Sequence, residues 1–212
     1  MSPALTGSYA PAVVPAPQGM LIVIEGISGS GKSTIAKLVA QQLSAYLLHT
    51  VPEPFQGLTP TINAELAPLP QLAFYLAGLC YASDLIRKNL TVGPVVADRY
   101  RTSVIANHAA VHGLVPQQVL DVAEPWMTYL IEPTLTVYLR TSPAALAERL
   151  ARKADLTESD RFLFAETSRY QAVQRFYDLL GTNDPSAWVL DTDDASPEQL
   201  TKLILDKAAT FA

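Results

Sequence analysis

The segment that most restricts the fold is the glycine-rich stretch 26–33, GISGSGKS, which stands between an apolar run and a segment of helical period. Its spacing matches the pattern G-x-x-x-x-G-K-[ST]. Gly26, Gly29 and Gly31 allow backbone conformations that other residues rarely adopt, so successive N–H groups can point at phosphate oxygens where the helix begins. The stretch therefore predicts a phosphate-binding loop.

The polar residues of this loop predict a nucleoside triphosphate with Mg²⁺ as its ligand. We expect Lys32 to reach the β- and γ-phosphates and the Ser33 hydroxyl to ligate Mg²⁺. A glycine-rich turn without a ligand is the alternative, and the Lys-Ser-Thr sequence in this context disfavours it. The residues of the loop that we expect to contact ATP are Gly26, Ser28, Gly29, Ser30, Gly31, Lys32, Ser33 and Thr34.

Short apolar runs alternate with longer segments of helical period from residue 20 onward. This alternation is typical of a parallel sheet that helices cover on both faces. The sequence therefore predicts an α/β fold with a five-stranded parallel sheet. The expected strands are residues 20–25, 46–51, 94–98, 134–140 and 187–191.

Capping residues predict where two of the helices begin. Ser142 is followed by Pro143, and proline suits the first position of a helix. The segment SPEQ at 196–199 places a Gln three residues after its Ser, which is the pattern of a capping box. Apolar stripes at 35–43 and 72–90 indicate the buried faces of two further helices.

We expect one folded domain at residues 19–212, because no second composition regime interrupts the chain. Residues 1–18 carry four prolines and no charged side chain, which indicates a flexible leader. This leader lacks the basic start and continuous apolar segment of a secretory signal. The polar stretch 152–161 interrupts the helical pattern, and we expect it to form a mobile flap.

Composition and charge indicate which binding partners and which cellular compartment to expect. A net charge of -5 without a run of Lys or Arg argues against nucleic acid as a partner. No apolar run approaches the ~18 residues of a membrane span, so we expect a cytoplasmic protein without a membrane partner. The lone Cys80 agrees with a reducing compartment and is expected in the core. His49, His108 and His112 have no spacing typical of a metal site or a triad, so we assign them to core or surface.

A second polar cluster follows the expected strand 94–98. Asp98, Arg99 and Tyr100 stand at its end, and the carboxyl ends of parallel strands meet at the ligand crevice. Asp98 could hold a Mg²⁺-bound water, and Arg99 could bridge donor and acceptor phosphates. A surface salt bridge at a strand end is the alternative, which the nearby phosphate loop disfavours.

At this point the chain resembles the thymidylate kinases and, more broadly, the deoxynucleoside and nucleoside monophosphate kinases. The resemblance implies a P-loop kinase architecture, a flap that closes over ATP, and transfer of the γ-phosphate to a nucleoside-type acceptor. The long helix could also form a homodimer face, as in that family. The segments that carry the resemblance are IEGISGSGKST at 24–34, EP at 53–54, DRY at 98–100, EPTLTVYLRTSPAALAERL at 132–150 and DRFLFAETSRYQAVQRFYDLL at 160–180.

The resemblance also implies roles for individual residues. Carried over by position, Arg149 would pack on the adenine, and Arg152 and Arg161 in the flap would stabilise the transferring phosphoryl group. Without the family, these arginines are equally well read as solvated helix charges. Phe74 is the best candidate to stack on an acceptor base, and Tyr100 is another, although a place in the core is the favoured reading for either ring.

The resemblance to the thymidylate kinases breaks down at the residues that would bind the acceptor. Thymidylate kinases grip the acceptor with one arginine just before EP and another on the long helix, where this chain has Pro52 and Gly78. Arg87 is no substitute, because nine residues of helix turn it to about the opposite face and carry it roughly 14 Å along the axis. A monophosphate needs cations, whereas a neutral sugar hydroxyl needs a carboxylate as a base. Glu53 matches that base in the deoxynucleoside kinases; capping its own loop is an equal alternative.

Three hypotheses of function follow. The leading one is an ATP-dependent kinase of thymidylate-kinase type that acts on a small-molecule acceptor, a nucleoside or a nucleoside monophosphate. A second is a kinase of a hydroxylated, nucleoside-like or antibiotic-related metabolite, which the missing arginines favour. A third is a sensor that binds ATP without transferring phosphate, and the retention of Lys32, Ser33, Asp98 and Arg99 argues against it.

Overall fold

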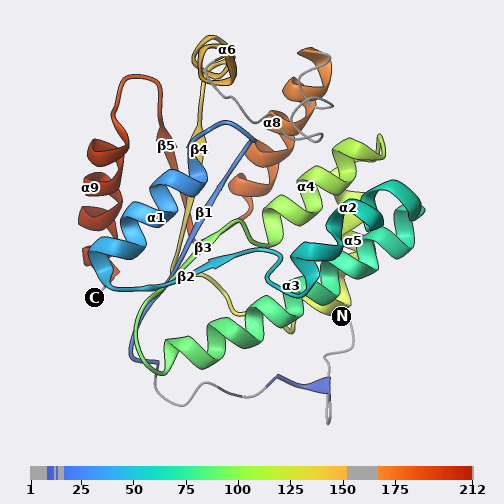
Figure 1. The fold of residues 1–212 in the computed structure, drawn as a ribbon, viewed down its shortest axis with the longest axis horizontal. Helices are drawn as coiled ribbons and strands as arrows, with labels where there is room; N and C mark the ends of the chain where they lie inside the picture. Colours follow the sequence, from blue (N-terminus) through green and yellow to red (C-terminus); the bar gives the residue numbers. More distant parts are fainter. Residues whose placement is uncertain (1–8, 12, 14–16, 152–166, 212) are drawn as a thin grey trace.

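The computed structural model describes residues 9–11, 13, 17–151 and 167–211. Its centre is one sheet of parallel strands with helices on both faces (Figure 1). The predicted five-stranded parallel α/β fold is therefore confirmed. In the spatial order β2-β3-β1-β4-β5, the sheet consists of β1 (Leu21–Gly26), β2 (Tyr46–His49), β3 (Val95–Asp98), β4 (Leu135–Arg140) and β5 (Ala187–Asp191).

The helices form two layers. Helices α1 and α9 pack together on one face, and α3, α4, α5 and α8 lie over the other (Figure 1). The described helices are α1 (Lys32–Leu43), α2 (Phe55–Glu65), α3 (Pro68–Leu90), α4 (Arg101–Val111), α5 (Pro116–Met127), α6 (Pro143–Ala151), α8 (Thr167–Thr182), α9 (Pro197–Ala208) and the short 3₁₀ helix η2 (Ala209–Phe211).

The central strand β1 explains why its sequence is almost continuously apolar. All of its residues are buried. Leu21 and Val23 point into the core beneath α3 and α4, whereas Ile22 and Ile24 point into the core beneath α1 and α9. Successive side chains of a strand point to opposite faces, so a strand covered on both faces needs apolar residues at every position. The last two residues of β1, Glu25 and Gly26, break this rule and belong to the candidate site.

Helix α3 is the long helix predicted at 72–90. By length and composition alone it could cross a membrane, since it has 23 residues and an 18-residue window of it reaches a mean hydropathy of 1.2. Leu72, Leu76, Leu79 and Ile86 are buried in the core against the sheet. We therefore describe α3 as the core helix of a globular domain.

The capping box predicted at 196–199 is present at the start of α9. The Ser196 hydroxyl accepts a hydrogen bond from the Gln199 backbone N–H at 3.3 Å, and the Gln199 side chain accepts one from the Ser196 N–H at 2.8 Å. Ser142 likewise accepts a hydrogen bond from the Ala145 N–H at 3.2 Å, and α6 begins at Pro143 as predicted.

We expect Ser196→Ala to lower the free energy of unfolding by about 1 kcal/mol, because the N-cap acceptor is lost. Urea denaturation of the variant and of Ser196→Asp, which keeps an acceptor, checks this. Equal losses of stability in the two variants would contradict the role assigned to the cap.

Several sequence-based expectations fall on residues that the structure does not describe. The expected flap at 152–161, with Arg152 and Arg161, lies outside the described residues. So does most of the expected leader at 1–18. Helix α6 ends at Ala151, and the chain is described again from the start of α8.

Candidate functional site

The predicted phosphate-binding loop joins β1 to α1, at the carboxyl end of the central strand (Figure 1). Gly26, Gly29 and Gly31 have φ angles of 142°, 84° and 95°. These values lie in the region that side chains disfavour, which explains the glycines of the motif. Gly31 is the N-cap of α1 and no side-chain hydrogen bond caps the helix there, so its positive end is available to an anion.

Close packing holds the loop against the sheet. A methyl group on Gly26 would lie 2.8 Å from the carbonyl oxygen of Leu139 on β4. A methyl group on Gly29 would lie 2.7 Å from Cδ1 of Leu146 on α6. Both distances are shorter than van der Waals contact. The backbone of β4 excludes a side chain at Gly26, whereas at Gly29 the end of the Leu146 side chain would have to move.

The polar side chains of the loop differ in exposure. Lys32 is 4% exposed, and its ammonium donates a hydrogen bond to the Ile27 carbonyl oxygen at 2.6 Å. The cation therefore lies back across the loop that precedes it. Ser33 and Thr34 are exposed, whereas Ser30 is buried and its hydroxyl has no hydrogen-bond partner. The loop thus combines a buried cation with accessible hydroxyls at the start of α1.

Asp98 ends β3 and lies beside this loop. It pairs with Ile24 of β1 in the parallel register and is 5% exposed. Its Oδ2 is 3.1 Å from His49 Nδ1, while its buried Oδ1 has no hydrogen-bond partner among the residues that the structure describes. Burial raises the pKa of Asp98, but hydrogen bonding by His49 and Ser33 and the charge of Lys32 outweigh it, so the pKa lies below its usual value.

This donor set fits a hydrated Mg²⁺. Mg²⁺ keeps several waters and is usually bound by one or two protein oxygens together with substrate phosphates. Asp98 supplies an ionised carboxylate with a spare oxygen, and Ser33 supplies an exposed hydroxyl next to it. Among the described residues, no group of three His, Cys, Asp or Glu side chains could hold a metal ion by itself.

Arg99 follows Asp98 in an uncommon backbone conformation. Its φ angle of 73° lies in the left-handed region, and its N–H donates to the Ile24 carbonyl at 3.0 Å. Non-glycine residues in this region are rare and cluster at functional turns. Its guanidinium Nη1 lies 3.4 Å from the Ser103 hydroxyl. Asp98 and Arg99 thus lie at the carboxyl edge of the sheet, next to the strand that leads into the phosphate loop.

Glu25 is a buried carboxylate that the sequence analysis did not single out. It is fully buried and accepts hydrogen bonds from the N–H groups of Tyr100 and Ser103, at 2.9 and 3.1 Å, and from the Ser103 hydroxyl at 2.5 Å. Tyr100 is the N-cap of α4, so Glu25 caps this helix from a neighbouring strand. Burial raises the pKa of Glu25, although the Ser103 and Tyr100 hydrogen bonds and the charge of Arg99 oppose this.

His49 was assigned to core or surface from the sequence, and its contact with Asp98 was missed. The imidazole belongs to β2, its side chain is 44% exposed, and the register between β2 and β3 places it opposite Asp98. The other two histidines agree with the assignment. His108 is buried, and its ring stacks on that of His112 with a centroid distance of 4.5 Å.

The acceptor side differs from what the resemblance implies. A methyl group on Gly78 would lie 2.5 Å from Val51 Cγ1 and 3.3 Å from Phe55 Cδ1, so these side chains occupy the space that a residue there would need. Pro52 is buried, and Glu53 is exposed where the chain passes from β2 to α2. Two positions that would carry cations therefore offer none.

The two aromatic side chains expected to contact the acceptor, Phe74 and Tyr100, differ in their exposure. Phe74 is half-buried, and its ring packs on that of Phe55 with a centroid distance of 5.5 Å. The expectation that Tyr100 contacts the acceptor needs correction, because its ring is 1% exposed and packs inside the core beneath α3. Arg87 is also buried, between Asp84 and the ring of Tyr129, and does not replace a missing arginine.

Arg149 reaches the phosphate loop from α6. Its Nη1 donates to the Ser30 carbonyl at 3.2 Å and to the Thr192 hydroxyl at 3.0 Å, and its Nη2 donates to the Thr192 carbonyl. The guanidinium thus bridges the loop and the segment after β5. This position at the donor end of the site is compatible with the role that the resemblance implies.

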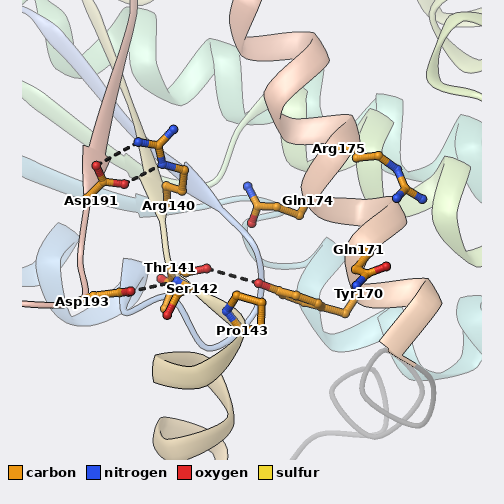
Figure 2. A pocket seen from close by; sticks show the side chains of 10 residues that line it. All are labelled: Arg140, Thr141, Ser142, Pro143, Tyr170, Gln171, Gln174, Arg175, Asp191 and Asp193. Carbon is orange, nitrogen blue, oxygen red and sulfur yellow. Dashed lines mark hydrogen bonds and ion pairs between the residues drawn. The ribbon is translucent and has the colours of Figure 1, made fainter.

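A cavity of about 380 Å³ lies at the carboxyl ends of β4 and β5, beside α8 (Figure 2). Its charged groups are largely paired, since Arg140 forms a two-fold ion pair with Asp191 at 2.5 and 2.9 Å. None of the described residues predicted for the site lines it. The lining residues are Arg140, Thr141, Ser142, Pro143, Tyr170, Gln171, Gln174, Arg175, Asp191 and Asp193.

Comparison with known proteins identifies the family. A family model described as thymidylate kinase matches residues 24–204. Thymidylate kinase of Chlorobium chlorochromatii is 30% identical over 214 residues, covering 90% of this chain and 95% of that protein.

Two solved structures share the fold. Thymidylate kinase from Candida albicans has a TM-score of 0.74 and 21% identity, covering 92% of this chain and 93% of that one. Deoxyadenosine kinase from M. mycoides has a TM-score of 0.65 and 16% identity, covering 90% and 100%. The loop, the strand-end cluster and these matches agree: the chain belongs to the thymidylate kinase family of phosphotransferases.

Proposed function

We propose that this protein transfers the γ-phosphate of ATP to a nucleoside monophosphate, with Mg²⁺ bound beside the phosphate loop. The observation that carries the proposal is that Lys32 and Asp98 lie together at the phosphate loop, with Arg99 following Asp98 at the carboxyl edge of β1 and β3. Phosphoryl transfer depends almost entirely on positioning and on electrostatic stabilisation, and these three side chains supply the charges it needs.

The donor would occupy the loop and the start of α1. Lys32 and the N–H groups of the loop would bind its phosphates, and Ser33 with Asp98 would hold Mg²⁺. When bound, the metal ion neutralises charge that develops on the phosphate oxygens. Arg149, held between Ser30 and Thr192, supports placing the adenine at the α6 end of the loop.

The acceptor would lie on the β2 and β3 side of the loop. Arg99 supplies the cation there, and Phe74 offers a partly exposed ring to a base. The family supports a nucleotide acceptor, since the matching family model and the relative from Chlorobium chlorochromatii are both described as thymidylate kinase. We further infer a cytoplasmic enzyme, which the burial of α3 in the core supports.

A nucleoside acceptor is the second candidate, because the acceptor side is short of cations. Pro52 and Gly78 carry no charge, and Val51 with Phe55 fills the space next to Gly78. A sugar hydroxyl needs a base rather than cations, and the exposed carboxylate of Glu53 stands on this side.

A paired acceptor panel tests the proposal. ATP consumption is measured with thymidine against dTMP, and with each other nucleoside against its monophosphate. We expect turnover with monophosphates and a change of less than about twofold in Glu53→Gln, because no hydroxyl base is needed. Glu65→Gln, an exposed change at the far end of α2, is the matched control.

The opposite pattern would support the second candidate. Turnover confined to nucleosides, with a loss of about 10²-fold or more in Glu53→Gln alone, would assign the proton to Glu53. If the protein bound ATP but turned over neither nucleosides nor monophosphates, both candidate functions would be contradicted.

A further inference from the structure

We propose that Tyr177 on α8 is a positioning residue for Arg99, acting through the buried hydroxyl of Ser103 and the carboxylate of Glu25. This inference deepens the proposed function and rests on it, since it assigns a support to the arginine that the proposed function places at the phosphates. Helix α8 follows the undescribed residues 152–166, so the contact brings a distant part of the chain to the turn after β3.

The Ser103 hydroxyl joins three side chains. It is buried and donates a hydrogen bond to Glu25 Oε2. A serine hydroxyl has one proton and two acceptor positions, so it can also accept. It accepts from Arg99 Nη1 at 3.4 Å and lies 2.9 Å from the Tyr177 hydroxyl. Ser103 is the point where the tyrosine and the arginine meet.

Burial makes this cluster rigid. Glu25 is 0% exposed and Tyr177 is 2% exposed, so neither group exchanges its partners with water. The backbone N–H groups of Tyr100 and Ser103, at the start of α4, donate to Glu25 Oε1 and hold this carboxyl group in place. A fully hydrogen-bonded buried network holds its members in one arrangement, whereas a partly satisfied one does not.

Arg99 is the member of the group that needs support. It lies in the left-handed region with a φ of 73°, and its side chain is only half-buried. A free arginine side chain has many rotamers, so holding the guanidinium in one place requires fixed partners. Ser103 and Tyr177 supply such partners, and Glu25 holds Ser103 in turn.

Tyr138 offers a matched control. It is buried to a similar extent, at 5% exposure, and its hydroxyl also bonds to α4 and to a carboxylate. Its partners, however, are Thr102 and Asp184, at 2.9 Å each, and not Arg99. Replacing either tyrosine by phenylalanine removes one buried hydroxyl, but only one of the two changes touches the support of Arg99.

The experiment compares Tyr177→Phe with Tyr138→Phe in the full chain, using the acceptor that the panel identifies. We expect Tyr177→Phe to lower kcat by about 10- to 100-fold with little change in KM for ATP, because small misplacements of a catalytic group cost this much. Tyr138→Phe should change kcat by less than about threefold. Combining Tyr177→Phe with Arg99→Lys should cost little beyond Arg99→Lys alone, since both act on one group.

A second readout needs no substrate and separates this inference from the proposed function. The side-chain Nε–H signal of Arg99 in ¹⁵N-arginine-labelled protein is assigned by its loss in Arg99→Lys. We expect it to shift and broaden in Tyr177→Phe and to stay in place in Tyr138→Phe. If the wild-type protein turned over no acceptor while this shift occurred, the proposed function would fail and the positioning role would stand.

Two results would overturn the inference. One is an unchanged Arg99 signal in Tyr177→Phe, whatever the activity. The other is an equal loss of kcat in both tyrosine variants that tracks their melting temperatures, which would indicate a purely structural role. If Tyr177→Phe does not fold, Ser103→Ala removes the same meeting point, and the same two results decide.

Discussion

Replacement of Lys32 by alanine is expected to lower kcat by about 10²- to 10³-fold, the range seen when one group that stabilises a transition state is removed. The ammonium is almost fully buried and lies back across the loop to the Ile27 carbonyl. In a site with little water its charge acts at close to full strength on the phosphate oxygens. ATP consumption with saturating acceptor measures the loss, and thermal unfolding checks that the variant is folded.

Lys37→Ala is the control for this prediction. Lys37 lies on the same helix, α1, but its side chain is exposed. Its removal takes away the same charge from the same element at a place where solvent screens it. We expect less than a twofold change in kcat. Similar losses in the two variants would show that the charge of the helix, and not the position of Lys32, matters.

Much of the fold could be predicted because its signals are local. The apolar runs of the central strands, the Ser142–Pro143 start of α6 and the capping box of α9 each depend on a few neighbouring residues. The glycine pattern of the phosphate loop is local too, since the φ angles at 26, 29 and 31 follow from the turn itself. Predictions of this kind need no knowledge of how the strands pair.

The site was less predictable because its contacts depend on register. His49 meets Asp98 only because β2 and β3 pair with these two residues opposite each other. Glu25 caps α4 only because β1 and β3 are neighbours, although they are separated by about 70 residues of chain. An acidic residue at the end of an apolar strand was the available signal for Glu25. Sequence spacing alone gave no signal for His49.

Packing explains the error over Tyr100. A tyrosine next to Asp98 and Arg99 suggests a role at the ligand, but the turn at Arg99 sends the next side chain inward, into the core beneath α3. The sequence also could not predict how the space beside Gly78 is filled. The structure shows that the side chains of Val51 and Phe55 occupy it, so a longer side chain at position 78, such as arginine, would have no room there.

Gly26→Ala is expected to weaken ATP binding by about 100-fold or more, because the phosphate loop cannot keep its path. The new methyl group would lie 2.8 Å from the Leu139 carbonyl oxygen and 3.1 Å from the Ser30 hydroxyl, at a φ of 142°. The backbone oxygen belongs to the central sheet and cannot move aside, so the loop must shift away from β4. A displacement of this size removes several N–H groups from the phosphates at once. Titration with a fluorescent ATP analogue measures the affinity.

Gly113→Ala separates the steric effect from the conformational one. Gly113 also has a positive φ, 64°, but no atom lies within 4 Å of the added methyl group. We expect it to lower stability by about 1 kcal/mol through its backbone conformation and to leave ATP affinity unchanged. Gly26→Ala adds the clash at β4 to its own unfavourable φ of 142°, and it does so inside the phosphate loop, so only this variant is expected to lose ATP affinity. Equal affinities for ATP in the two variants would mean that the loop tolerates a side chain at its first position, contrary to its packing against Leu139.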